Sequence, residues 1–207
     1  QTGFWSGLRQ LLTNRRWLIF LAAALVQGMS LSIFLNYLFL HLEGMGVSRI
    51  IMGYTLTIST VSEIPIFIFS KKLLRRGAPL LLAASLFFAV IRAFAYAGMT
   101  EGWHVLLISL LHGPTFAAMW AAGVAYADEA AGPGLSATAQ GVFGGTVMGL
   151  GTALGALVGG FLYEQSGAIA AFRWAGWTSL AALIFFLFAH RHGVVDLLQA
   201  AKAPSIR

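Results

Sequence analysis

Three ionisable side chains lie inside long apolar stretches of the sequence: Glu63, Arg92 and His112. A charge near the centre of a bilayer costs at least about 2.5–3.5 kcal/mol on insertion scales, so such residues usually line a polar pathway inside a protein. A carboxylate and an imidazole can exchange protons, and a guanidinium stays charged. The three residues therefore predict a proton- or solute-binding site. The alternatives are a static ion pair between Glu63 and Arg92, and a neutral His112 that is hydrogen-bonded between helices.

Two of these residues are each followed by a proline two positions later, Pro65 after Glu63 and Pro114 after His112. A proline inside a helix lacks a backbone donor, so a carbonyl one turn earlier loses its usual partner and the helix can bend. In membranes such weakened backbone occurs where protein or a water-filled cavity surrounds it. The pattern therefore predicts that both side chains lie next to an interior cavity.

Three more residues are candidates for the same site. Gln27 and Asn36 belong to the first apolar stretch, where they either hydrogen-bond a solute or join neighbouring helices. Trp120 either stacks on a ring of the solute or packs within the bundle.

The composition indicates a membrane protein. Hydrophobic residues make up 58% of the 207 residues and charged residues 10%, which is more apolar surface than one soluble core can hide. No cysteine is present, which excludes disulfides and thiolate metal sites. The net charge of +6 does not indicate nucleic-acid binding, because the basic residues cluster at the ends of apolar runs. Metal-ligand repeats, phosphate loops and dinucleotide fingerprints are also absent, so no cofactor or metal is expected.

Six apolar segments are each near the roughly 20 residues that a helix needs to span a bilayer. They cover residues 17–40, 49–70, 79–98, 103–127, 137–163 and 170–189. The sequence thus predicts an all-α membrane protein with a bundle of six transmembrane helices over 17–189. A cytoplasmic linker is expected over 1–16 and a cytoplasmic tail over 190–207. Six spans divide into two triplets of opposite orientation, a 3+3 inverted repeat.

Basic residues predict the orientation, because cytoplasmic loops carry the excess of lysine and arginine. One side of the six segments has Arg9, Arg15, Arg16, Lys71, Lys72, Arg75, Arg76, Arg191, Lys202 and Arg207. The other side has Arg49 and Arg173. Both termini are therefore expected in the cytoplasm, in a multi-pass protein of the plasma or inner membrane.

The fifth segment has glycines at every fourth position, in two registers. One set is Gly141, Gly145 and Gly149, and the other is Gly151, Gly155 and Gly159. Small residues at this spacing let another helix approach closely in lipid. They predict either ordinary helix packing or a moving interface between two halves of a carrier.

Around Glu63, Arg92 and His112, and in the fifth segment, the sequence is similar to a known family. The similar stretches are residues 62–65, 91–94, 111–116, 134–141 and 160–167. They resemble the C-terminal half of the lactose-permease-like major facilitator transporters, and among these the phenylpropionate-permease-like subgroup. Residues 71–77 resemble the basic loop that connects helices in the wider superfamily. The resemblance covers essentially the whole chain.

That resemblance implies a proton-coupled carrier with twelve spans, in which these six would follow an N-terminal half of six helices. The counterparts of Glu63, Arg92 and His112 then take part in solute recognition and proton coupling. Lactose permease also has a glutamate three residues after the histidine, on the same helical face. This chain has Thr115 there, and Thr115 is a further candidate for the solute- and proton-binding site. Glu63 is then the deeply placed acid of this half, and coupling either depends on the other half or is missing. The first residue, Gln1, agrees with a piece of a longer protein.

The sequence therefore predicts a secondary active transporter and not an enzyme. It would work by alternating access in the lipid bilayer, with protons and a small-molecule solute such as a sugar or an aromatic acid. One alternative is a non-transporting membrane receptor or scaffold. The other is a six-span intramembrane hydrolase with Ser30 as nucleophile and His112 as base, although Leu31 replaces the second glycine expected around such a nucleophile.

Overall fold

The structure, a computed structural model, describes residues 2–190, without the side chains of residues 2–4, 6, 8 and 10. Within this range the chain is helical and contains no strand, which confirms the predicted all-α class. The elements are α1 (Thr2–Thr13), α2 (Arg15–Gly44), α3 (Arg49–Ile68), α4 (Ser70–Leu74), α5 (Ala78–Ala97), α6 (His104–Ser109), η1 (Gly113–Ala117), α7 (Ala118–Ala130), α8 (Ser136–Gly144), η2 (Gly145–Gly151) and α9 (Thr152–Ala189). Here η1 and η2 are π-helical segments. Except for its first residue, the predicted tail over 190–207 lies outside the described residues.

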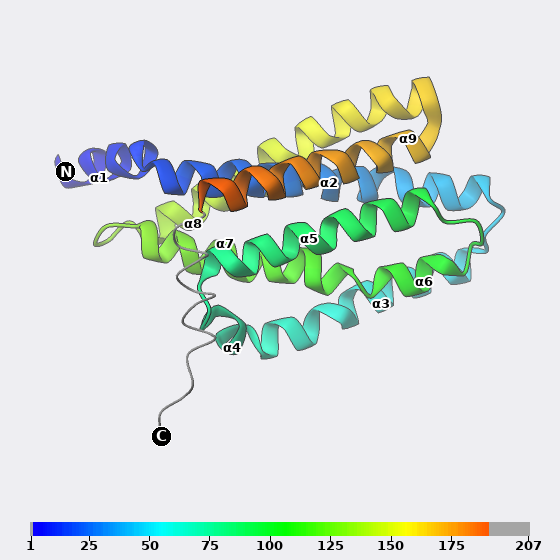
Figure 1. Ribbon diagram of the computed structural model, residues 1–207, viewed down its shortest axis with the longest axis horizontal. Coiled ribbons are helices and arrows are strands. Elements are labelled where there is room, and N and C mark those ends of the chain that lie inside the picture. The colour runs from blue at the N-terminus through cyan, green and yellow to red at the C-terminus, as the bar shows by residue number, and fades with distance from the viewer. Residues whose placement is uncertain (1, 191–207) are drawn as a thin grey trace.

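Five stretches of the described chain are long and apolar enough to cross a membrane: Arg15–Gly44, Arg49–Ile68, Ala78–Ala97, His104–Ala130 and Ser136–Ala189. The last has 54 residues, more than twice the length of a single crossing. Gly167 within it has φ 78° and ψ 178°, a conformation that glycine adopts readily. In Figure 1 the ribbon reverses direction between its yellow and orange parts. The predicted segments 137–163 and 170–189 lie on either side of this reversal.

Local signals set the starts of the long helices. Asn14 precedes α2, and its side-chain oxygen accepts hydrogen bonds from the backbone N–H groups of Arg16 (3.1 Å) and Trp17 (3.3 Å). Ser48 precedes α3 and accepts in the same way from Ile51 (3.4 Å). Such caps satisfy donors that have no partner inside the helix.

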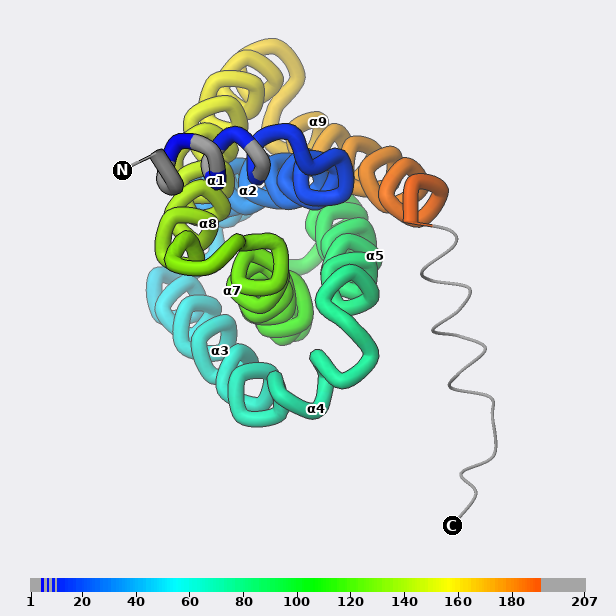
Figure 2. The backbone as a smooth tube through the Cα atoms, turned by 90° about the vertical axis from the view of Figure 1, so that its left-hand side faces the viewer, coloured from blue at the N-terminus to red at the C-terminus, as the bar shows by residue number. Residues whose placement is uncertain are grey.

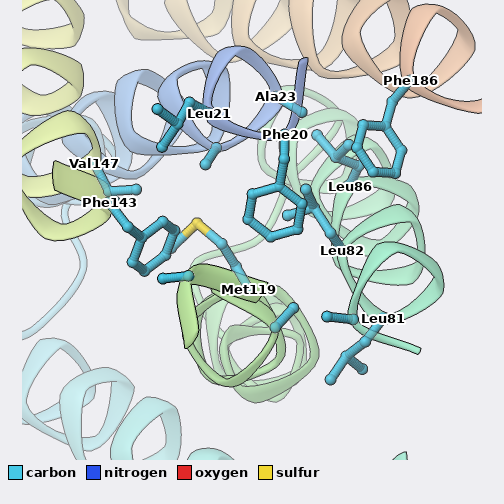
Figure 3. Packing of buried hydrophobic residues seen from close by; sticks show 14 of the residues in the cluster. Phe20, Leu21, Ala23, Leu81, Leu82, Leu86, Met119, Phe143, Val147 and Phe186 are labelled. Atoms are coloured by element: carbon cyan, nitrogen blue, oxygen red, sulfur yellow. The ribbon is translucent and has the colours of Figure 1, made fainter. Parts of the chain in front are cut away.

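The core consists of two apolar clusters at different heights along the bundle. The Trp17 cluster contains Trp17, Phe20, Leu82, Leu86, Met119, Phe143 and Phe186. Figure 3 shows Phe20, Met119 and Phe143, from α2, α7 and α8, pointing toward one another. The Tyr96 cluster contains Ile33, Phe34, Leu42, Tyr96, Val105 and Phe172.

A band of buried polar residues lies between these two clusters along the helices. The band consists of Gln27, Ser30, Ser85, Arg92, Thr115 and Ser179. Its members bond to one another across helices: Ser85 donates to Gln27 Oε1 (2.9 Å), and the Ser30 and Ser179 hydroxyls lie 3.1 Å apart. Buried polar groups need such partners because each unsatisfied one is costly in an apolar medium. The band places Arg92 at the level where the two clusters meet.

The helices differ in how much of their surface this bundle covers. Helices α2 and α5 each have many buried residues, whereas Thr55 is the only buried residue of α3. In the end-on view of Figure 2, α7 lies near the centre, and α3 and α4 lie at the outer edge. Most of α3 therefore faces away from the helices of this chain.

Candidate functional site

Glu63, His112 and Arg92 form a continuous array across three segments of the chain. His112 Nε2 lies 3.1 Å from Glu63 Oε1, and His112 Nδ1 lies 2.8 Å from Arg92 Nη1. Glu63 comes from α3, Arg92 from α5, and His112 from the residue directly before η1. The three residues that the sequence singled out thus meet at one place. Glu63 and Arg92 do so through His112, rather than as the direct pair that the sequence left open.

Arg92 is held by neutral groups on its other sides. Nη1 donates to Thr115 Oγ1 (3.1 Å), and Nε and Nη2 each lie 3.4 Å from the Tyr96 hydroxyl. The guanidinium also lies over the rings of Phe34 and Tyr96, 5.0 and 5.4 Å from their centroids. A cation over an aromatic face is attracted by the ring quadrupole. The side chain is only 5% exposed, so these contacts hold a charge inside the bundle.

The geometry of the array assigns the proton on His112. A guanidinium is only a donor, so Nδ1, which faces Arg92, must be the acceptor. Nε2 then carries the hydrogen and donates to the Glu63 carboxylate. A doubly protonated His112 would place an N–H against the N–H of Arg92, two donors and two positive charges together. A proton that enters the array therefore goes to Glu63 while the contact between Arg92 and His112 lasts.

Gly113 brings His112 and Glu63 together. Its N–H donates to Ser62 Oγ (2.8 Å), and a Cβ atom at this position would overlap the backbone carbonyl of Ser62. A glycine here lets η1 lie directly against α3. Ser62 and Gly113 both lie inside the stretches of family similarity at 62–65 and 111–116, and the sequence predicts no role for either. The signal that could have pointed to them is their position, each next to an ionisable residue.

The π-helical turn of η1 gives Thr115 its place. Pro114 lacks a backbone donor in this segment, and π-helical turns are frequent at functional sites. The Thr115 hydroxyl lies 2.8 Å from the Leu111 carbonyl and 2.9 Å from that of His112. It can donate to one of them and accept from Arg92, so the structure places Thr115 beside the array.

Arg92 lines two spaces inside the bundle. One is a cavity of about 130 Å³, bordered by Phe34, Tyr96 and His112 and by the hydroxyl residues Ser59 and Thr60, among others. The other is small, about 20 Å³, and Gln27 and Thr115 contribute to it. Tyr96 is not among the residues predicted from the sequence, although it lies one helical turn after Arg92 and hence on the same face of α5.

Two predicted residues lie apart from the array. The Asn36 side chain donates to the Ser32 carbonyl (2.8 Å) and hydroxyl (3.1 Å), and Asn36 lines a separate open groove of about 630 Å³. Trp120 packs against Phe116 and Phe143, with ring centroids 5.9 and 5.4 Å away. Both side chains have structural contacts here, and neither lines the cavity next to Arg92.

The two glycine sets lie in different surroundings. A Cβ atom at Gly151 or Gly159 would come within 3.0 Å or less of α2, and one at Gly155 would overlap the backbone of Met29. A Cβ atom at Gly141, Gly145 or Gly149 would meet nothing within 4 Å. The structure therefore places the second set in a close helix contact and leaves the first set open.

The geometry of a serine hydrolase is not formed. The hydroxyl of Ser30 is buried and lies 3.1 Å from that of Ser179. Both ring nitrogens of His112 are engaged by Arg92 and Glu63. A nucleophile and its base must lie within hydrogen-bond reach, so Ser30 and His112 do not make such a pair in this arrangement.

The chain matches the MFS_1 like family over residues 4–174. It belongs to this family. Among its relatives, human "Major facilitator superfamily domain-containing protein 6-like" is 31% identical over 147 residues, which cover 70% of this chain and 25% of the relative. The mouse protein of the same name is 29% identical over 141 residues, 68% of this chain and 24% of the relative. The Xenopus laevis "Major facilitator superfamily domain-containing protein 6-like protein A" is 25% identical over 153 residues, 73% of this chain and 25% of the relative.

Membership of the MFS_1 like family, together with the apolar helices, makes the chain an integral membrane protein of the major facilitator superfamily. It spans about a quarter of the length of the curated relatives it matches. No solved structure matches the chain significantly. The superfamily predicted from residues 62–65, 91–94 and 111–116 is thus confirmed, whereas the narrower likeness to lactose and phenylpropionate permeases stays a prediction.

Proposed function

We propose that this member of the MFS_1 like family is part of a secondary active transporter that moves a small organic solute together with protons. In this proposal the reversal at Gly167 divides Ser136–Ala189 into two spans, so the chain has six, arranged as two inverted triplets. Both termini face the cytoplasm. A second bundle of six helices, from another part of the whole protein, covers the other side of the binding site.

The array of Glu63, His112 and Arg92 is the observation that supports this function. Ionisable residues within membrane helices mark proton relays and solute pathways far more often than structural positions. Here an acid, an imidazole and a guanidinium are hydrogen-bonded in series. The imidazole and the guanidinium also line a cavity. A purely structural ion pair would need neither the intervening histidine nor the cavity.

The array provides a way to pass protonation of Glu63 on to Arg92. When a proton enters the array, Nε2 gives its hydrogen to the Glu63 carboxylate and Nδ1 takes up the incoming proton, so the imidazole stays neutral and changes tautomer. Nδ1 can no longer accept from Arg92 Nη1, so that donor becomes available to a solute. Alternating access then exchanges the side from which the loaded site opens.

The open glycine face supports the second bundle in this scheme. Gly141, Gly145 and Gly149 present a surface without side chains, on which another helix can lie closely in lipid. Most of α3 is also uncovered in this chain. Both surfaces are where we place the moving contact between the two bundles.

The test is proton flux in vesicles that contain the whole transporter. Sugars and aromatic acids are added outside, and pyranine trapped inside reports acidification. We expect at least one solute to drive proton entry in the wild type and Glu63→Gln to abolish that entry. Glu101→Gln, an exposed glutamate before α6, is the matched control. Unchanged proton entry in Glu63→Gln would remove Glu63 from the coupling, and binding of a solute without flux would favour a receptor.

A further inference from the structure

The charge of Arg92 has no carboxylate in direct contact within the described residues. In this part of the chain Arg92 contacts the imidazole of His112, the hydroxyls of Thr115 and Tyr96, and two aromatic faces. All of these are neutral, since His112 must be neutral to accept from Nη1. Glu63 balances the charge only across the imidazole. A buried cation in this position attracts a further anion.

Arg92 also has unused hydrogen-bonding capacity. A guanidinium has five N–H donors, and both donors of Nη1 are engaged by His112 and Thr115. Nε and Nη2 share one oxygen of Tyr96, each at 3.4 Å, which is long for such a bond. These two nitrogens form the edge of the guanidinium that binds a carboxylate in a bidentate way.

The cavity of about 130 Å³ fits the remainder of such a ligand. Phe34, Phe39 and Tyr96 line it together with four leucines, and Ser59 and Thr60 add hydroxyl groups at one wall. Mostly apolar walls with a few placed polar groups are typical of sites for small organic molecules. The chemistry favours a planar apolar body with one carboxylate.

Electroneutrality links this anion to a proton. With Glu63 ionised and Arg92 charged, the empty array has no net charge, and an added monoanion would leave one negative charge in a poorly solvated place. Protonation of Glu63 restores neutrality.

Other ionisable groups on the elements packed against α3 lie near the ends of those helices. They are His104 of α6, Lys71 and Lys72 of α4, and Tyr126, Asp128 and Glu129 of α7.

We propose that the site takes up a small organic monoanion on Arg92 together with one proton on Glu63. This inference rests on the proposed transport function and names its substrate class. Anion and proton bind cooperatively, because each removes the unbalanced charge that the other creates. The proton comes from the aqueous side to which the cavity is open, and no covalent bond to the solute is formed.

The experiment measures binding of benzoate and phenylacetate to the whole purified transporter at about pH 6 and about pH 8, by calorimetry. Benzamide and phenylacetamide, the neutral analogues, are the ligand controls. We expect both acids to bind about tenfold more tightly at the lower pH, within the 5–150-fold range of coupled sites, and the amides to bind weakly at both.

Glu63→Gln is the decisive variant because it gains binding and so does not depend on a loss of fold. It should bind benzoate at about pH 8 as tightly as the wild type does at about pH 6, without further pH dependence. Arg92→Gln should lose benzoate binding, and Arg173→Gln, an exposed arginine on α9, should retain it.

Amides that bind as well as the acids, acid affinity that does not change with pH, or weaker binding of benzoate to Glu63→Gln would each overturn the inference. Proton flux driven by a neutral sugar, without binding of either acid, would also overturn it while the proposed transport function stands. If no solute of either kind drives flux, the transport function itself fails.

Discussion

Helices α5 and α3 each supply one charge to the same array, but the bundle holds them very differently. Arg92 lies on α5 among the buried residues Ala89, Ala93 and Tyr96. Glu63 lies on α3, where only Thr55 is buried. The guanidinium is therefore set in place by the core of this chain, whereas the carboxylate depends on one crossing of helices. This difference is what a switch needs, because a fixed charge and a movable partner can separate without unfolding the core.

The glycine-rich stretch before Gly167 also combines tightly packed positions with uncovered ones. Gly155 lies in close contact with α2, whereas a Cβ atom at Gly145 would meet no other atom within 4 Å. A tight contact between backbones is stabilised by many small dispersion terms that require a fixed distance. The glycines of the open set, Gly141, Gly145 and Gly149, make no such tight contact within the described residues. Their surface is therefore available for the moving contact with the second bundle that we propose.

The largest effect expected from this comparison is that of Gly155→Val. The new side chain overlaps the backbone of Met29, and overpacking of a tight contact typically costs about 1–3 kcal/mol, occasionally more. Gly145→Val, which changes helix propensity in the same way, should cost much less in this bundle. Thermal unfolding followed by tryptophan fluorescence measures both. Equal destabilisation by the two valines would show that the registers do not differ.

A smaller but more specific effect is expected for Gly113→Ala. Its methyl group would overlap the Ser62 carbonyl and force η1 away from α3, which lengthens the contact between His112 and Glu63. Overpacking at this crossing should cost about 1–3 kcal/mol. If a cost near the low end of that range is lost from the contact between His112 and Glu63, proton-coupled uptake should fall by about tenfold. Gly53→Ala, on an open face of α3, is the control. Full activity of Gly113→Ala would mean that the crossing does not position Glu63.

The smallest expected effect is that of Ser62→Ala. This change removes the hydroxyl that accepts from the Gly113 N–H at 2.8 Å, and such a bond contributes about 0.5–1.5 kcal/mol. The crossing should loosen without steric conflict, so the pH dependence of uptake weakens while the protein stays folded. Thr57→Val, whose hydroxyl bonds within α3 only, is the control. An unaltered pH profile in Ser62→Ala would mean that contacts other than this hydrogen bond hold η1 against α3.

The chemical types at the site were predictable because charges in apolar stretches are rare and costly. Glu63, Arg92 and His112 meet in the structure as expected, and Thr115 contacts Arg92 beside them. Asn36 and Trp120 were candidates on the same grounds of residue type and position. In the structure, however, Asn36 bonds to Ser32 and Trp120 packs against Phe143, away from the array. Tyr96, Ser62 and Gly113 were missed as partners because nothing in their type marks them without knowledge of their neighbours.

By itself the sequence determined that the chain is helical and membrane-embedded, and which residues carry charge into the apolar region. Hydropathy and segment length are local properties, so they survive without coordinates. Only the tertiary structure decided that His112 lies between Glu63 and Arg92, and which glycine register contacts α2. Both outcomes depend on how whole helices cross and rotate against one another, and that geometry is set by the sum of many distant contacts rather than by any one segment.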